Sequence, residues 1–85
     1  MKSVYSEEYE RFVDCLIAAR KSANLTQQVL AQKLKKPQSF VSKYERRERR
    51  LDVIEFLKIA EAIGEDPSRL LKGMEKRRLL SKEAK

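Results

Sequence analysis

Residues 25–50 read LTQQVLAQKLKKPQSFVSKYERRERR, and this stretch decides the fold. The hydroxyl of Thr26 suits the cap of a helix, since it can accept a hydrogen bond from an amide of the first turn. Leu25 and Leu30 stand at the N′ and N4 positions, where a pair of apolar residues fixes the direction in which the chain enters a helix. A helix over residues 26–34 is therefore predicted.

Lys35, Lys36 and Pro37 interrupt the apolar pattern at the end of that helix. Proline has no amide hydrogen and a fixed φ, so a helix accommodates it best in the first turn. A second helix over residues 37–46 is predicted on this basis. Two short helices joined by a turn of about three residues form a helix-turn-helix.

The residues before this stretch predict one longer helix. Ser6 can cap it, and Glu7 and Glu8 follow in the first turn, where the helix dipole favours carboxylates. Asn24 is expected to end it. The apolar positions recur at helical spacing and form one stripe, made of Tyr9, Phe12, Val13, Leu16 and Ile17.

Two more helices are predicted after residue 50. Asp52 and Glu55 have the spacing of a capping box and open the first, which Gly64 ends. Pro67 begins the last helix, which is expected to be short and to close at Gly73. The chain is therefore predicted to be all-α, a compact five-helix bundle. The side chains of these two helices that are expected to face the core are Phe56, Leu57, Ala60, Ile63, Leu70 and Leu71.

Length and composition limit the class of protein. The 85 residues are enough for one small domain, placed at residues 1–73, and a basic tail, residues 74–85, that either extends the last helix or stays disordered. Cys15 is the single cysteine and histidine is absent, so neither an internal disulfide nor a zinc site is expected. The chain has no apolar run of membrane-spanning length and no signal peptide, which predicts a cytoplasmic protein. No nucleophile–base pair or phosphate-binding loop indicates an enzyme.

The net charge of +7 is unevenly distributed. Residues 25–50 hold eight basic and two acidic residues, whereas residues 51–72 hold three basic and five acidic. Residues 73–85 are again basic, with five basic and two acidic residues. Such clustering favours a polyanionic partner, with nucleic acid ahead of an anionic membrane. A basic surface that serves only solubility is the alternative.

A helical wheel of residues 37–45 separates two faces. The apolar face holds Pro37, Phe40, Val41 and Tyr44. The opposite face has one lysine, two hydroxyls and one amide, and no acid; its residues are Gln38, Ser39, Ser42 and Lys43. Amides, hydroxyls and lysine can all bind base edges in the major groove of DNA. A face built only for solubility would more often mix Glu with Lys.

Four arginines follow this face directly: Arg46, Arg47, Arg49 and Arg50. The loop after a helix that lies in a groove comes close to the sugar-phosphate backbone, where arginines hold phosphates and displace counterions. The alternative is a charged turn in which Glu45 and Glu48 pair with the arginines. Two acids cannot neutralise four arginines, so part of the cluster is expected to bind phosphate.

The whole pattern resembles the phage-repressor and Cro type, or Xre-like, helix-turn-helix family of DNA-binding proteins. The resemblance covers roughly residues 9–73, and its most specific parts are LTQQVLA at residues 25–31 and VSKYE at residues 41–45. It implies a lambda-repressor-like five-helix bundle in which the third helix enters the major groove of double-stranded DNA. It also implies a transcriptional regulator, which we expect to act as a homodimer on a two-fold-related operator. So small a core leaves no room for a cofactor or a small-molecule effector, and no metal is expected.

The resemblance assigns roles to particular residues. It implies that Gln27, at the start of the second helix, contacts a phosphate. It also implies a partly buried ion pair between Arg20 and Glu45, which ties the first helix to the end of the third. Base edges are expected to be read by Gln38, Ser39, Ser42 and Lys43, and phosphates to be held by Gln27 and by some of Lys36, Arg46, Arg49 and Arg50.

Arg47 departs from the family pattern, because family members often have glycine just past the third helix. Either Arg47 adopts the left-handed conformation at some energetic cost, or the third helix runs on and the turn is built differently.

Two other functions remain open. One is an antitoxin or protein-interaction adaptor that uses the same fold, and the other is a membrane-surface binder that uses the basic tail.

Overall fold

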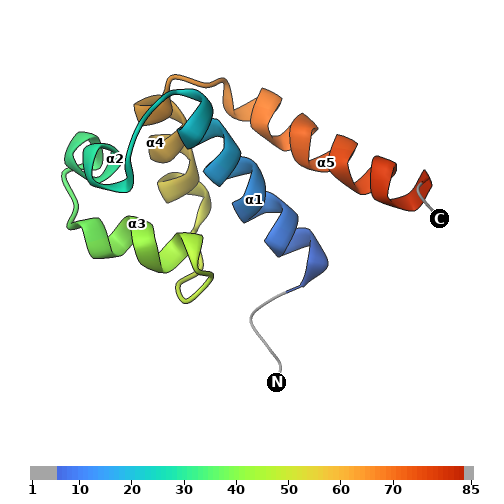
Figure 1. Ribbon diagram of the computed structural model, residues 1–85, viewed down its shortest axis with the longest axis horizontal. Helices are drawn as coiled ribbons and strands as arrows, with labels where there is room; N and C mark the ends of the chain where they lie inside the picture. The colour runs from blue at the N-terminus through green and yellow to red at the C-terminus, as the bar shows by residue number, and fades with distance from the viewer. Residues whose placement is uncertain (1–5, 84–85) are drawn as a thin grey trace.

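The computed structural model describes residues 6–83 of the chain, with side-chain surroundings described up to residue 75. These residues form helices only, which confirms the all-α prediction (Figure 1). The helices pack as a small bundle in which α1 lies against α5 and α2 lies against both α3 and α4. Their bounds are α1 Glu7–Ser22, α2 Gln27–Leu34, α3 Gln38–Glu45, α4 Val53–Ile63 and α5 Pro67–Glu83.

Helices α1, α2 and α4 begin with the caps that the sequence predicts. Ser6 and Thr26 each accept a hydrogen bond from the amide three residues on, at 3.1 Å, and cap α1 and α2. Asp52 and Glu55 form the reciprocal capping box of α4, with each side chain accepting from the other residue's amide. Pro37 is the N-cap of α3 and stands just before the helix instead of within its first turn.

The core is built from side chains of all five helices. Its largest fully buried side chain is Tyr44 of α3. The buried cluster around it is made of Leu16, Leu30, Ala31, Val41, Tyr44, Phe56, Ile59, Ala60, Ile63 and Leu70. Helix α3 therefore has one face inside the bundle, while its other face remains outside, at the lower edge of the molecule in Figure 1.

Two leucines expected in the core are exposed. Leu57 of α4 is 43% exposed and Leu71 of α5 is 44% exposed. The core-facing row of α4 runs through Phe56 and Ile59 at helical spacing, and Leu57 lies about 100° away from it around the helix. Leu70 already fills the inward position of α5, which turns its neighbour outward.

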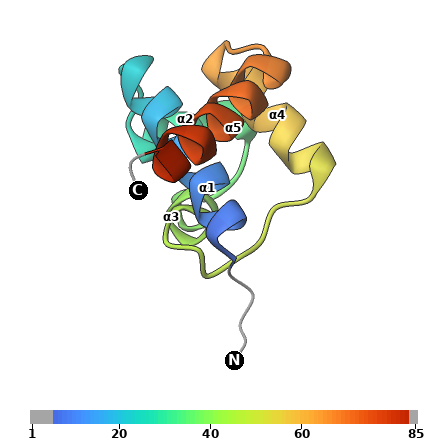
Figure 2. The same ribbon diagram turned by 90° about the vertical axis from the view of Figure 1, so that its right-hand side faces the viewer.

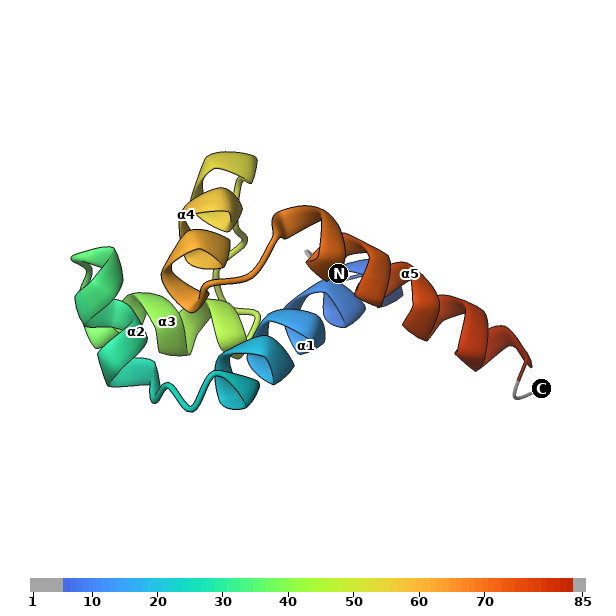
Figure 3. The same ribbon diagram turned by 90° about the horizontal axis from the view of Figure 1, so that it is seen from above.

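The prediction that Gly73 closes the last helix is wrong, because α5 continues through Gly73 to Glu83. A Cβ built on Gly73 would lie 3.9 Å from the Sγ atom of Cys15, so this position belongs to the face of α5 that packs on α1. The far half of α5 extends beyond the end of α1 in the view from above (Figure 3). In the described part of the chain, no helix is long and apolar enough to cross a membrane.

Candidate nucleic-acid interface

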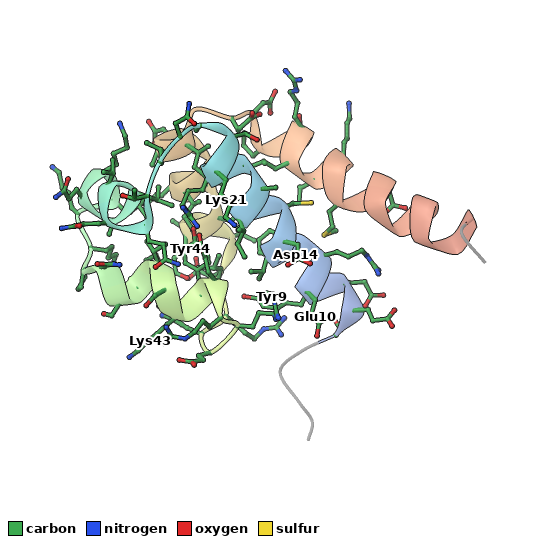
Figure 4. The ribbon with its side chains drawn as sticks, in the orientation of Figure 1. Tyr9, Glu10, Asp14, Lys21, Lys43 and Tyr44 are labelled. Carbon is green, nitrogen blue, oxygen red and sulfur yellow. The ribbon has the colours of Figure 1, made fainter. Side chains whose placement is uncertain are left out.

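The outer face of α3 holds the four residues predicted to read bases. Gln38, Ser39 and Lys43 are exposed, and Ser42 is half-buried with its hydroxyl donating to the Ser39 carbonyl at 3.3 Å. Lys43 points away from the bundle while the neighbouring Tyr44 points into it (Figure 4). The structure thus brings these four side chains together on one side of a helix, as their spacing predicts.

A buried ion pair ties the end of α3 to α1 on the side that faces the bundle. Arg20 of α1 donates to both carboxylate oxygens of Glu45, from Nε to Oε2 at 2.7 Å and from Nη2 to Oε1 at 3.1 Å. The two residues are only 9% and 7% exposed. Arg20 Nη1 also donates to the carbonyl oxygen of Leu25 at 2.7 Å, and this hydrogen bond ties the ion pair to the loop between α1 and α2. The ion pair that the family resemblance implies is therefore present.

Gln27 belongs to the same network. Its Nε2 atom donates to Oε1 of Glu45 at 2.8 Å, so the first residue of α2 is tied to the last residue of α3. This contact fixes the side chain at the start of α2, where the amides of the first turn and the helix dipole favour an anion.

Tyr44, the neighbour of Glu45 in α3, is fully buried in the core. Burial, and next the negative charge of Glu45, raise the pKa of Tyr44 above its ordinary value, against the opposing effect of Arg20. The hydroxyl is buried and makes no hydrogen bond to the described residues. The side chain therefore contributes packing and remains neutral.

The turn after α3 adopts the first of the two geometries considered for Arg47. The helix ends at Glu45, and Arg47 has φ +62°, in the left-handed region. Its amide donates to the Tyr44 carbonyl at 3.0 Å, and the amide of Glu48 donates to the Lys43 carbonyl at 2.8 Å. These two bonds form a Schellman motif, which is usually built with glycine at the position of Arg47. The alternative in which helix α3 runs on is thereby excluded.

Arg46, Arg47 and Arg49 of the loop have carboxylate partners, and the ion pair of Arg47 with Asp14 is the longest, at 3.7 Å. Arg46 pairs with Glu48 at 3.0 Å on the surface, and this hydrogen bond lowers the pKa of Glu48. Arg49 makes a two-pronged contact with Glu55 at 3.0 and 2.8 Å. The guanidinium of Arg49 also stands 4.9 Å from the centre of the Phe40 ring. Arg49 therefore connects the loop to both α3 and α4.

Tyr9 of α1 is hydrogen-bonded to the backbone of the same loop through its side chain. Its hydroxyl accepts from the Leu51 amide at 3.2 Å and donates to the Arg49 carbonyl at 3.5 Å. The guanidinium of Arg50 lies 4.3 Å from the centre of the Tyr9 ring. The apolar stripe predicted that Tyr9 lies in the core, and it is buried there. The stripe gave no indication that the hydroxyl of Tyr9 also binds the loop after α3. The one signal in the sequence was a tyrosine where a phenylalanine would fill the same space.

The remaining predicted phosphate ligand, Lys36, lies at the other end of α3. It is exposed in the turn between α2 and α3, and its Nζ atom is 5.5 Å from the centre of the Phe40 ring. Cations thus flank the polar face at both ends, with Lys36 before it and Arg46 and Arg50 after it. This arrangement can present polar side chains to base edges while cations meet the two flanking phosphate strands.

Five helices with an exposed polar face on the second helix of a helix-turn-helix define the class of lambda-repressor-like DNA-binding domains. A family model described as helix-turn-helix matches residues 16–70, more than half of the chain. The chain therefore belongs to the Xre-like helix-turn-helix family of DNA-binding proteins.

Solved structures of other proteins are similar to this chain. An XRE-family like protein from Pseudomonas syringae pv. tomato str. DC3000 shares 50% sequence identity with a TM-score of 0.77, covering 82% of this chain and 85% of that one. The clp gene regulator ClgR from C. glutamicum has a TM-score of 0.76 at 16% identity, covering 86% of this chain and 95% of its own, and so shares the fold. Comparison with curated proteins gives no match.

Proposed function

We propose that this protein is a transcriptional regulator that reads a specific DNA sequence with the outer face of α3. The observation that carries the proposal is the acid-free polar face of α3, which is exposed on a helix held rigidly from behind. Gln38, Ser39, Ser42 and Lys43 are the base-reading residues. Lysine can bind guanine, glutamine can bind adenine with two hydrogen bonds, and serine can bind several bases.

Phosphate contacts are proposed on both sides of this face. Gln27 at the start of α2 and Lys36 in the turn bind one strand, and Arg46 and Arg50 bind the other. Arg46 can exchange its surface contact with Glu48 for a phosphate at little cost, because exposed ion pairs contribute little to stability. Arg49 was also predicted to bind phosphate, but we do not propose it as a ligand, because Glu55 and Phe40 already hold its guanidinium. It shapes the loop that carries Arg50.

The buried contacts supply the rigidity that base reading needs. Arg20 and Gln27 fix Glu45 at the end of α3, so the angle of the helix is set before DNA arrives. A preformed face loses less conformational entropy on binding than one that must be ordered by its partner.

The protein is proposed to act as a homodimer on a two-fold-related operator. A pair of recognition helices about 34 Å apart can enter successive turns of the major groove. Helix α5 and the tail are proposed to lie at this interface.

A mobility-shift assay with fragments of the source genome, at several salt concentrations, tests the proposal. We expect a small set of fragments to be retained at high salt while bulk DNA is released, because base contacts depend on salt less than phosphate contacts do. Retention of all fragments to the same degree, or of none, would contradict sequence-specific reading. The second outcome would favour the adaptor or antitoxin alternative.

A further inference from the structure

Glu48 places a carboxylate on the side of the molecule that is proposed to face DNA. It belongs to the loop after α3, and this loop and α3 lie at the same lower edge of the bundle in two views (Figures 1 and 2). Residues 25–50 contain two acids, and the other one, Glu45, is buried against Arg20. The side chain of Glu48 is 52% exposed. An exposed negative charge at this position opposes the binding of a phosphate backbone.

The fold does not require the carboxylate of Glu48. Its amide helps to close the turn after α3 by donating to the Lys43 carbonyl at 2.8 Å, but every residue except proline has such an amide. Its side chain accepts two hydrogen bonds from the guanidinium of Arg46, at 3.0 and 3.1 Å. The two residues are neighbours in one exposed turn, and ion pairs of this kind contribute little to stability.

The second two-pronged ion pair of the loop, between Arg49 and Glu55, is different. Glu55 belongs to α4, its side chain is only 20% exposed, and its carboxylate also accepts the Asp52 amide in the capping box. That pair connects the loop to a neighbouring helix, whereas the pair of Arg46 with Glu48 joins two residues of the loop itself. The construction of the loop therefore explains Glu55 but does not explain Glu48.

The contact between Arg46 and Glu48 has the geometry of a phosphate contact. Nε and Nη2 of the guanidinium donate to different carboxylate oxygens, Oε2 and Oε1. A guanidinium binds two oxygens of a phosphate through the same arrangement of donors. The hydrogen bond from Arg46 lowers the pKa of Glu48, and the positive charges of Arg46 and Lys43 lower it further, so the carboxylate is ionised at neutral pH. Glu48 thus occupies the donors that a DNA phosphate would use.

We propose that Glu48 competes with DNA for the guanidinium of Arg46 and thereby limits the affinity of the protein for every duplex. The inference rests on the proposed function, in which Arg46 binds a phosphate. A phosphate that binds Arg46 must displace the carboxylate, which then remains beside the DNA backbone and repels it. The penalty is the same for an operator and for random DNA, because it arises at the phosphates, where no sequence is read.

The competition also affects the salt dependence of binding. A basic residue that neutralises a phosphate releases counterions from DNA and contributes about 0.9 to the slope of log K against log salt. Arg46 and Glu48 together carry no net charge, so when both lie at the DNA surface they should displace almost no counterions. In the wild type, the Arg46 contact should therefore contribute little to the slope.

The test variant is Glu48→Gln, which removes the charge and keeps the shape of the side chain. The matched control is Glu65→Gln, which makes the same change in net charge at an exposed residue between α4 and α5. That connection lies at the edge of the bundle opposite α3 (Figure 1). The full chain is titrated against a random-sequence duplex and against a genomic fragment retained in the mobility-shift assay, at several salt concentrations. Thermal melts check that both variants are folded.

We expect Glu48→Gln to tighten binding to both duplexes by roughly three- to tenfold at low salt, with their ratio unchanged. The salt slope should become steeper by about one unit. Glu65→Gln should change both quantities much less, because its charge is distant from the DNA and screened. Unchanged binding by Glu48→Gln would overturn the proposal. A loss confined to the genomic fragment would also overturn it, because Glu48 would then read a base, as a carboxylate reads cytosine.

A second background distinguishes competition from simple repulsion. In an Arg46→Gln protein, Glu48 has no guanidinium to occupy, so Glu48→Gln removes only the repulsion between the carboxylate and the phosphates. The gain in affinity should therefore be smaller in this background than in the wild type. Equal gains in the two backgrounds would show that Glu48 does not compete for Arg46, and the proposal would be wrong.

Failure of this proposal can be told apart from failure of the proposed function. A protein that binds all duplexes alike, but binds them more tightly as Glu48→Gln, would support the competition and contradict sequence-specific reading. A selective DNA binder that is unchanged by Glu48→Gln would have the opposite meaning. A chain that binds no duplex at all would overturn both.

Discussion

The outer face of α3 and the loop that follows it are adjacent and both polar, yet their side chains are held very differently. On α3, Gln38 and Lys43 extend from a rigid helix as exposed groups. In the loop, Arg49 is held by Glu55 and by the ring of Phe40. The backbone around it is bound to the hydroxyl of Tyr9. The comparison shows that a cluster of arginines is not in itself a phosphate site, because part of it can be used to build the loop that presents the rest.

The support common to both regions is the Arg20–Glu45 pair, and its loss should have the largest effect. Arg20→Ala leaves the buried carboxylate of Glu45 without its partner, which should lower the free energy of unfolding by about 3 kcal/mol. Urea denaturation measures this. Lys21→Ala, an exposed neighbour on the same helix, is the control and should unfold like the wild type. Equal stability of the two variants would show that the pair is not a support.

The two regions should fail differently on DNA. Lys43→Ala should lose roughly 1–3 kcal/mol on the preferred operator and much less on a scrambled duplex, so discrimination falls. Arg50→Ala should weaken binding to both duplexes by similar factors and lower the slope of log K against log salt by about one unit. Titration of both variants against both duplexes at three salt concentrations provides the measurement. Should Lys43→Ala weaken both duplexes equally, Lys43 holds a phosphate and α3 is docked differently from our proposal.

The hydroxyl of Tyr9 can be removed without touching the core. Tyr9→Phe leaves the Leu51 amide without its acceptor and should cost about 1 kcal/mol of stability. It should also weaken DNA binding, because the loop that carries Arg50 is released. Tyr44→Phe is the matched control: that buried hydroxyl makes no hydrogen bond to the described residues, so its removal should not lower the melting temperature. If the two variants melt alike, the Tyr9 contact does not hold the loop.

The smallest expected effect is a gain. Arg47→Gly should stabilise the domain by up to about 1 kcal/mol, because glycine tolerates the left-handed conformation that Arg47 adopts. The ion pair between Arg47 and Asp14 is long, at 3.7 Å, and lies on the surface, so removing it costs little. Arg46→Gly is the control, since Arg46 has φ −84° and gains nothing from glycine. Thermal melts that rank the two variants in the opposite order would contradict this account of the turn.

Local patterns were enough to predict most of the fold. The caps at Ser6 and Thr26 and the capping box of Asp52 depend on residues within one turn, so the sequence reveals them directly. The polar face of α3 also follows from spacing alone. The predictions that Leu57 is buried and that Gly73 ends a helix were wrong. Whether an apolar residue next to a core position is buried, and whether a glycine ends a helix, depends on the helix packed against it.

The candidate site was less predictable because its contacts join distant parts of the chain. Arg20 pairs with a residue 25 positions away, and only the family resemblance indicated it. Its position four residues after Leu16, on the apolar stripe of the first helix, was a usable signal. The bond between Tyr9 and Leu51 spans 42 positions, and no local pattern encodes it. Arg49 looked like its neighbours in sequence, and its contacts with Glu55 and Phe40 exist only in the folded bundle.

The burial of Arg20 and Glu45 has a practical consequence for handling the protein. Dissolved ions screen the interaction between exposed charges that lie farther apart than the Debye length, which is about 8 Å at physiological ionic strength. Buried ion pairs are screened much less. Concentrated salt should therefore detach the basic surface from heparin or phosphocellulose while leaving the buried pair beneath α3 intact. The protein should elute in its native form, and desalting alone should return it to full DNA-binding competence without a refolding step.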